Sequence, residues 1–227
     1  MRESIFKIID NAPLTETVYK MKLQGDVSDI TSSGQFVNIK LDGLYLRRPI
    51  SVCDCEGDVL TLIYKVVGKG TEQMAKMTAG EELNILTGLG NGYDISLSGD
   101  KPLLLGGGVG VPPLYMLCKK LIAEGKKVSV VLGFNTKDEV FCEEDFKALG
   151  ADVFVTTVDG SYGIKGFVTD AMKDIDYSYF YTCGPEPMLK AIFKASATNG
   201  QFSFEERMGC GFGACMGCSC KTVTGYK

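Results

Sequence analysis

Hydrophobic and polar residues alternate along the first part of the chain, up to about residue 97. The alternation is clear in VYKMKL (18–23), GQFVNIKL (34–41) and VLTLIYKVV (59–67), which are separated by turn sequences such as LDG and EGD. A period of two places the apolar side chains on one face of a strand. Several short strands with turns between them predict a small antiparallel β-barrel or sandwich over residues 1–97.

The pattern changes near residue 98. PLLLGGG (102–108) is a continuous apolar run followed by a helix-like segment, and three further apolar runs alternate with helix-like segments up to about residue 200. Strands that are apolar throughout and alternate with helices are typical of a parallel sheet covered on both faces. We therefore expect an α+β multi-domain protein: an antiparallel β-barrel, an α/β parallel-sheet domain over 98–200, and a small C-terminal lobe over 201–227.

The composition of the chain excludes several kinds of catalytic and metal-binding site. The 227 residues include no histidine and carry a net charge of −4. Without histidine, Ser-His and Cys-His nucleophiles and His-ligated zinc or haem are excluded, whereas hydride and electron transfer need no protein base because a cofactor carries the chemistry. The negative charge disfavours a nucleic-acid partner. No apolar run approaches the roughly 20 residues of a membrane helix and MRESIFKIID lacks a signal-peptide pattern, so we expect a cytoplasmic protein with no membrane span.

Four of the nine cysteines lie within GCGFGACMGCSC, near the C-terminal end. In a cytoplasmic protein such a group is a better candidate for metal binding than for disulfides. Cys210, Cys215 and Cys218 have the spacing C-x4-C-x2-C, the first three positions of the plant-type [2Fe-2S] pattern. The intervening glycines let backbone N–H groups approach a cluster closely. The alternatives are a zinc site, although only Cys215 and Cys218 form a C-x2-C pair, and a group of unligated thiols.

The spacing leaves the fourth cluster ligand open. In the plant-type pattern it lies further downstream, and this chain ends at Lys227. Cys220 is one candidate, since residues i and i+2 of a strand face the same side, but its spacing is atypical. We expect instead that the chain is shorter than the native gene product and lacks the last ligand. A native stop codon after Lys227 would refute this.

A second candidate site lies in the barrel. Only four arginines occur in the chain, and Arg47 and Arg48 are adjacent in LRRPIS, at a strand end. A guanidinium group suits a diphosphate, and Ser51 adds a hydroxyl donor. Further on, IYKVVGKGT contains a Gly-x-Gly-Thr turn that can direct backbone N–H groups at phosphate, with Thr71 capping the next helix. An exposed arginine pair at a turn is the alternative; together, these features favour a flavin dinucleotide.

A third candidate site combines two strand ends of the parallel sheet. LLLGGGVGVPPLYML is a strand that ends in glycines and opens a helix with proline, a phosphate-cradling arrangement. The acidic residue of the Rossmann fingerprint is absent, because the second strand ends LGFNTKDE. The last strand ends YTCGPEPM at a carboxyl edge, where open α/β sheets bind ligands. A plain strand–helix turn and a small buried cysteine are the alternatives; the pairing of the two ends predicts a nicotinamide cleft. Its residues are Gly107, Gly108, Gly110, Cys183, Gly184 and Pro185.

The motifs together resemble a known family. The Arg-Pro-x-Ser motif, the Gly-x-Gly-Thr turn, the GGGxG turn and the late Cys-Gly-Pro occur here in the order seen in the ferredoxin–NADP reductase superfamily. With GLGNGY, VDGSYGIKG, YTCGPEPMLKA and CGFGACMGC, almost the whole chain is similar to the electron-transfer subunits of NAD-dependent bacterial dihydroorotate dehydrogenases.

The resemblance implies cofactors, ligands and a partner. Electrons would pass from a separate FMN-containing catalytic subunit, which oxidises dihydroorotate in pyrimidine biosynthesis, through a [2Fe-2S] cluster and FAD to NAD⁺, within a heterotetramer of two subunits of each kind. The cluster ligands would be Cys210, Cys215 and Cys218. The FAD-binding residues would be Arg48, Pro49, Ile50, Ser51, Ile63, Tyr64, Lys65, Gly70 and Thr71.

Other interpretations stay open. NAD is favoured over NADP because no arginine follows the second strand of the parallel sheet, although Lys137 could in part replace one. A flavin and iron–sulfur subunit of another complex, such as NADH-dependent ferredoxin:NADP oxidoreductase or a sulfide dehydrogenase, would share the same motifs. A non-catalytic metal-binding or redox-sensing protein would bind no flavin.

Overall fold

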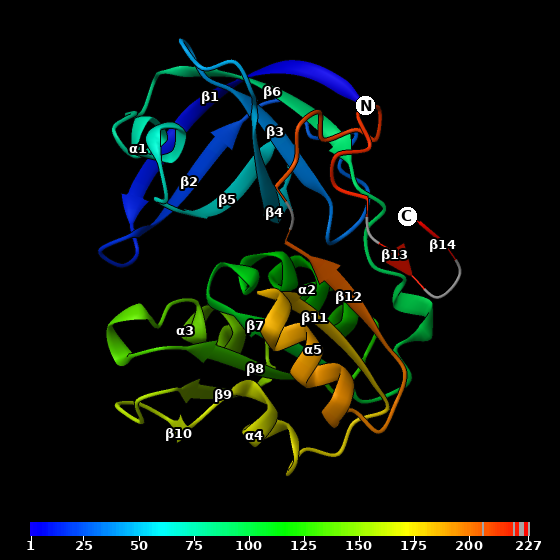
Figure 1. Cartoon of the computed structure of the whole chain (residues 1–227). Coiled ribbons are helices and arrows are strands. Elements are labelled where there is room, and N and C mark those ends of the chain that lie inside the picture. Colours follow the sequence, from blue (N-terminus) through cyan, green and yellow to red (C-terminus); the bar gives the residue numbers. More distant parts are fainter. Residues whose placement is uncertain (206, 220, 223–224, 227) are drawn as a thin grey trace.

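The first half of the chain closes into a barrel, as Figure 1 shows for the computed structural model, which describes residues 1–205, 207–219, 221–222 and 225–226. Six antiparallel strands follow one another around it in the order β1-β2-β5-β4-β3-β6. They are β1 (Arg2–Pro13), β2 (Val18–Gln24), β3 (Phe36–Lys40), β4 (Arg48–Glu56), β5 (Val59–Lys65) and β6 (Glu82–Leu89). The predicted antiparallel barrel is therefore confirmed.

The alternation in the sequence accounts for the barrel interior. In β6 every second residue is buried, so that Leu83 and Ile85 face inward while their neighbours lie nearer to solvent. The same period of two turns Met21 and Leu23 of β2 into the same cluster. A single short helix, α1 (Lys69–Ala75), packs on the barrel through the buried Met74.

The second half forms a six-stranded parallel sheet in the order β10-β9-β8-β7-β11-β12. Its strands are β7 (Pro102–Gly107), β8 (Ser129–Phe134), β9 (Asp152–Thr157), β10 (Ile164–Lys165), β11 (Tyr179–Gly184) and β12 (Gly200–Phe204). The predicted α/β parallel sheet is confirmed. Its edge strand β12 comes from the segment that the sequence pattern assigns to the C-terminal lobe.

Helices cover both faces of this sheet, which explains why its strands are apolar throughout (Figure 1). Leu104 faces the cluster that contains α2 (Tyr115–Ala123) and α3 (Glu143–Ala148). Its neighbour Leu105 faces α4 (Val168–Met172) and α5 (Glu186–Ala195). Short 3-10 helices lie at η1 (Ile95–Leu97), η2 (Gly108–Gly110), η3 (Pro112–Leu114) and η4 (Lys137–Glu139).

EVFCEEDFKALG (139–150), one of the helix-like segments of the sequence, forms a helix over only part of its length. Cys142 adopts a left-handed backbone conformation with φ of +63°, which is rare for a residue with a side chain. This residue ends the irregular segment after η4, and α3 begins only at Glu143.

The barrel and the parallel-sheet domain share apolar packing. Val18, Cys53 and Ile63 belong to the barrel strands, yet their side chains lie in the cluster formed by α2 and the parallel sheet. In return, Met116 of α2 packs into the barrel cluster. The two halves are therefore joined by a continuous hydrophobic contact.

After β12 the chain returns to the barrel. The orange-red segment in Figure 1 runs up beside β3, where Asn38 Nδ2 donates a hydrogen bond to the carbonyl oxygen of Cys210 at 3.1 Å. Two short antiparallel strands follow, β13 (Lys221–Thr222) and β14 (Gly225–Tyr226). In the described part of the chain, no helix is long and apolar enough to cross a membrane.

Candidate functional site

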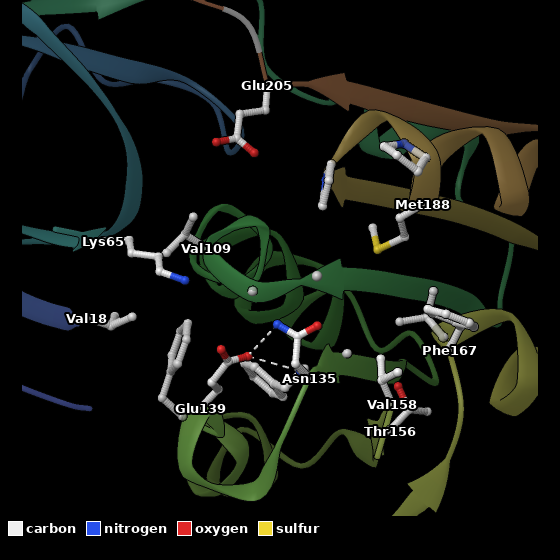
Figure 2. Close-up of a pocket in the computed structure, with 18 of the residues that line it drawn as sticks. Val18, Lys65, Val109, Asn135, Glu139, Thr156, Val158, Phe167, Met188 and Glu205 are labelled. Carbon is white, nitrogen blue, oxygen red and sulfur yellow. Dashed lines mark hydrogen bonds between the residues drawn. The ribbon is translucent and has the colours of Figure 1, made fainter. Parts of the chain in front are cut away.

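A cavity of about 550 Å³ lies between the barrel and the carboxyl ends of the parallel strands (Figure 2). Gly107 and Gly108 line it at the end of β7, and Pro185 lines it after β11. Because β8 and β11 flank β7 on opposite sides, the chain changes direction across the sheet here, which is where open α/β sheets bind ligands. On the barrel side the cavity is lined by Val18 and by Lys65, the last residue of β5.

Glycine at position 110 allows the two strand ends to meet. A Cβ atom on Gly110 would lie 2.2 Å from the carbonyl oxygen of Cys183, so no side chain fits there. Gly108 has a φ of +52° and open space where its side chain would be, which exposes its backbone beside the cavity. The GGGVG turn and the Cys-Gly-Pro segment therefore lie in contact at one edge of the sheet.

Cys183 contributes a neutral thiol to this edge. Its side chain is buried at the end of β11, and burial raises its pKa to about 11. The thiol is therefore protonated near neutral pH, when it resembles a small apolar group more than a nucleophile.

Several cavity residues are not found by the sequence motifs. Glu139 carries a carboxylate that accepts hydrogen bonds from Asn135, at 3.0 Å from its backbone nitrogen and 2.9 Å from its side-chain nitrogen (Figure 2). Glu205, the residue directly after β12, lies over the cavity, and Met188 and Phe167 line its far side from Lys65. The sequence signal for Glu139 is its position, because it follows the carboxyl end of an apolar strand, and Glu205 likewise follows the carboxyl end of a parallel strand.

Arg47 and Arg48 have different surroundings. Arg47 forms an ion pair with Glu3 at 3.1 Å and donates to the carbonyl oxygens of Asn38 and Asn84. Arg48 is half-buried at the start of β4, donates to the carbonyl oxygen of Leu46 and has no carboxylate partner among the described residues. A half-buried guanidinium group without a counter-charge fits the diphosphate of a dinucleotide.

The Gly-x-Gly-Thr turn lies next to Arg48. A Cβ atom on Gly70 would lie 2.2 Å from Arg48 Nε, so glycine is needed for the guanidinium group to pack across the turn. Thr71 lies inside the first turn of α1, which begins at Lys69, and caps the helix from there rather than from a position before it. Its hydroxyl accepts the backbone N–H groups of Val67 and of the N-cap residue Gly68, at 2.9 and 3.3 Å, and thereby stabilises the turn and the start of the helix.

The other predicted flavin residues lie on the adjacent strands of the barrel. Pro49, Ile50 and Ser51 are half-buried in β4. In β5, Ile63 is buried against the parallel-sheet domain, and the Tyr64 hydroxyl, 3.0 Å from Asn11 Oδ1, donates to it inside the barrel. The structure thus gathers Arg48 with Gly70, and Lys65 with Gly107, Gly108 and Pro185.

The cysteine loop, defined as residues 209–219, has donor chemistry that suits iron. The backbone N–H of Cys215, 3.4 Å from Cys210 Sγ, and that of Phe212 lower the pKa of the Cys210 thiol to about 6. Thiolates surrounded by backbone N–H groups are the ligands of iron–sulfur clusters. Nowhere in residues 1–205, 207–219, 221–222 and 225–226 do three His, Cys, Asp or Glu side chains converge closely enough to hold a metal ion. The alternative ligand Cys220 lies outside the described residues.

The sequence of the chain is similar to those of known proteins over most of its length. Residues 104–194 match the family described as oxidoreductase NAD-binding domain. The chain is 46% identical over 226 residues to the dihydroorotate dehydrogenase B (NAD(+)) electron transfer subunit of Fusobacterium nucleatum subsp. nucleatum, covering 93% of this chain and 87% of the relative. It is 45% identical over 233 residues to the protein of the same name from Bacillus pumilus, covering 98% and 90%.

Solved structures share the architecture. A chain of the NADH-dependent reduced ferredoxin-NADP oxidoreductase superposes with a TM-score of 0.88 at 30% identity, over 98% of this chain and 84% of that one. A ferredoxin NADP⁺ reductase from Neisseria gonorrhoeae, with FAD and NADP bound, gives 0.77 at 16% identity, over 90% and 100%, which shows the fold alone. On the strength of its curated relatives, the chain belongs to the family of electron transfer subunits of dihydroorotate dehydrogenase B (NAD(+)).

Proposed function

We propose that this chain passes electrons from an FMN-containing catalytic subunit, which oxidises dihydroorotate in pyrimidine biosynthesis, to NAD⁺, within a heterotetramer of two subunits of each kind. The family supports this role. The structural observation that supports this proposal is that the barrel contacts both the cavity and the cysteine loop. Lys65 of β5 lines the cavity, and Asn38 of β3 is hydrogen-bonded to the cysteine loop.

Electron transfer between the cavity and the cysteine loop requires a group that can exchange electrons with both. A flavin supplies this chemistry when bound, because flavins exchange both hydride and single electrons, whereas nicotinamide takes only hydride and a [2Fe-2S] cluster only single electrons. The chain's own task is to bind and orient the three groups and to keep their distances fixed.

The cavity is the proposed NAD site. The backbone of Gly108, beside open space, suits the diphosphate, and the Lys65 ammonium group adds positive charge on the opposite wall. Gly107 and Pro185 also line the cavity, and Gly110, Cys183 and Gly184 would shape the strand ends beside it. The Cys183 thiol, protonated near neutral pH, adds no charge at this strand end.

The proposed FAD site is on the barrel face around Arg48. The guanidinium group of Arg48, which has no carboxylate partner among the described residues, and the hydroxyl of Ser51 would bind the diphosphate, and the turn at Gly70 and Thr71 would close over it. Pro49, Ile50, Ile63, Tyr64 and Lys65 belong to neighbouring strands, whose backbone would border the ring system.

The proposed cluster site is the cysteine loop. Cys210, Cys215 and Cys218 would hold the cluster, and the lowered pKa of Cys210 supports a thiolate there. The motif leaves the fourth ligand open, and the candidate Cys220 lies outside the described residues.

The deciding experiment is an anaerobic visible spectrum of the purified protein before and after adding NADH, together with iron and sulfide counts. We expect flavin absorption that bleaches with NADH, beside broad cluster absorption. On mixing with the catalytic subunit, dihydroorotate should then drive NADH formation. A protein with no flavin would contradict the proposal.

A second candidate function has one observation in its favour. The similarity to the NADH-dependent reduced ferredoxin-NADP oxidoreductase, at 30% identity, extends over nearly the whole chain. As a subunit of such a complex, the chain would exchange electrons with a partner that reduces NADP⁺. Dihydroorotate-dependent NADH formation separates the two, because only the first function predicts it.

A further inference from the structure

We infer that Asn38 is a positioning residue that holds the cysteine loop against β3, the neighbour of the proposed flavin strand β4. The inference rests on the proposed function, since the loop matters for electron transfer only if a cluster is bound there. It begins from a contact between two residues 172 positions apart: Asn38 Nδ2 donates to the carbonyl oxygen of Cys210 at 3.1 Å. Asn38 is only 2% exposed, so the contact is shielded from water.

The loop is shaped to make this contact. Gly211, which follows Cys210, has a φ of +75°, and a Cβ atom there would lie 2.7 Å from Asn38 Nδ2. The same Cβ would lie 3.6 Å from the ring of Phe36, also on β3. The loop backbone therefore rests directly on the side chains of β3, and any side chain at position 211 would push it away.

Asn38 is itself fixed to the proposed flavin strand. Its backbone pairs in register with Pro49 of β4, the neighbour of Arg48, and its carbonyl oxygen accepts from Arg47 at 3.2 Å. A movement of the cysteine loop is thus transmitted through one side chain to the strand that carries Arg48 and Ser51. The distance from Cys210 to this strand is set by Asn38 rather than by the length of the connecting chain.

An asparagine at this position is not explained by barrel stability. Its Oδ1 is buried and has no hydrogen-bond partner among the described residues. A buried polar atom without a partner is destabilising, so an apolar side chain of similar size would suit the barrel better. What asparagine supplies that leucine lacks is the donor to Cys210.

Asn84 provides a matched control. It lies on the neighbouring strand β6, its Oδ1 is likewise buried without a partner among the described residues, and its carbonyl oxygen also accepts from Arg47, at 3.4 Å. Its Nδ2, however, donates to Glu3 of the barrel at 2.7 Å and does not contact the cysteine loop. Asn38→Leu and Asn84→Leu each remove one buried side-chain oxygen that has no partner among the described residues, but only the first removes the link to Cys210.

The first test is amide hydrogen exchange in the flavin-containing protein without iron. The readout is the peptide containing the Cys215 N–H, which lies 3.4 Å from Cys210 Sγ. Loss of one hydrogen bond should speed its exchange roughly three- to tenfold in Asn38→Leu, and leave it unchanged in Asn84→Leu. Equal exchange in wild type and Asn38→Leu, or equal acceleration in both variants, would overturn the inference.

A second pair of variants approaches the contact from the loop and leaves the barrel sequence intact. Gly211→Ala introduces a side chain that meets Asn38, whereas Gly213→Ala has a similar positive φ of +83° but nothing within 4 Å. Both substitutions strain the backbone, so only the clash distinguishes them. The inference predicts faster exchange around Cys215 in Gly211→Ala than in Gly213→Ala, and equal rates would contradict it.

The third test uses the iron-loaded protein and NADH in a stopped-flow instrument. Flavin bleaching by NADH should be unchanged in Asn38→Leu, while the following reduction of the cluster slows at least threefold; Asn84→Leu should match wild type in both phases. Equal slowing in both variants would contradict the positioning role. If wild type itself binds no cluster, the proposed function of the loop fails, and the exchange experiments still decide whether Asn38 holds it.

Discussion

The hydroxyl group of Tyr93 donates a hydrogen bond to the carbonyl oxygen of Thr182 at 3.2 Å. Tyr93 follows the last strand of the barrel, and Thr182 precedes Cys183 at the cavity end of β11. One side chain therefore fixes the residues on which the proposed nicotinamide site depends. Its ring also packs edge-on against Tyr181, with ring centres 5.5 Å apart.

The variant Tyr93→Phe should keep this packing and lose the hydrogen bond. We expect a loss of about 1 kcal/mol in the free energy of unfolding and a roughly threefold higher KM for NADH at unchanged kcat, because the end of β11 is less well fixed. Tyr181→Phe is the control, since its hydroxyl donates to the Asp94 carbonyl at 2.8 Å, away from the cavity. It should lose similar stability with an unchanged KM. If the KM for NADH rose equally in both variants, the rise would result from a general loss of stability and not from the Tyr93 hydrogen bond.

Arg47 and Arg48 should differ sharply in flavin retention. Arg48→Ala removes the half-buried guanidinium group that has no carboxylate partner among the described residues, and should lower the flavin content of the purified protein at least tenfold. Arg47→Ala should keep its flavin and lose about 1 kcal/mol of unfolding free energy, because its contacts are with Glu3 and backbone carbonyls. The ratio of flavin to protein absorbance measures the first effect, and urea unfolding the second. If both variants lost flavin equally, Arg47 and Arg48 would contribute equally to flavin binding, contrary to the prediction.

The Glu139 carboxylate should disfavour NADPH. It is the acidic side chain near the end of β8, and its negative charge would repel an additional phosphate in the cavity. Glu139→Gln keeps an acceptor oxygen for Asn135 and should raise kcat/KM for NADPH roughly three- to tenfold, with that for NADH within about twofold of wild type. Flavin bleaching rates with the two nucleotides measure this. A wild-type enzyme that already prefers NADPH would overturn the assignment.

The buried Cys118 thiol should make the protein less stable at alkaline pH. Burial raises its folded-state pKa from 9.0 to about 12. Between these values the unfolded chain has released the proton that the folded chain retains. Rising pH therefore favours unfolding, by about 1.4 kcal/mol per pH unit for this thiol.

The variant Cys118→Ala tests this through the slope of the unfolding free energy against pH, rather than through its value at one pH. The substitution leaves a small cavity on α2, which lowers stability by a similar amount at every pH. The dependence of unfolding free energy on pH above 9 should become shallower by about 1.4 kcal/mol per unit, measured by urea denaturation. Parallel curves for variant and wild type would indicate that the thiol titrates normally in the folded state.

The sequence predicts the architecture well because periodicity is a local property. Alternation in β2, β3 and β5 and continuous apolar runs in β7, β8 and β11 define the barrel and the sheet without knowledge of tertiary contacts. Strand-end glycines such as Gly108 and Gly110 could also be placed, since parallel strands bring their carboxyl ends to one edge.

Other features depend on residues far apart in the chain and could not be predicted. Arg47 and Arg48 look equivalent in LRRPIS, and their surroundings differ through distant contacts such as the ion pair of Arg47 with Glu3, 44 positions away. The link from Asn38 to Cys210 spans 172 positions and has no local pattern. The position of Glu205 beside the cavity has no sequence signal either, because the pattern of the residues before the cysteine loop does not indicate that they form the edge strand β12 of the parallel sheet.

The packing of Val18, Cys53 and Ile63 into the core beneath α2 bears on how the cleft can move. A hinge motion between the two halves would expose these side chains to water, at a cost in free energy. Apolar packing between domains opposes their relative motion. The same packing couples the unfolding of the two halves, because each loses buried apolar contacts when the other unfolds.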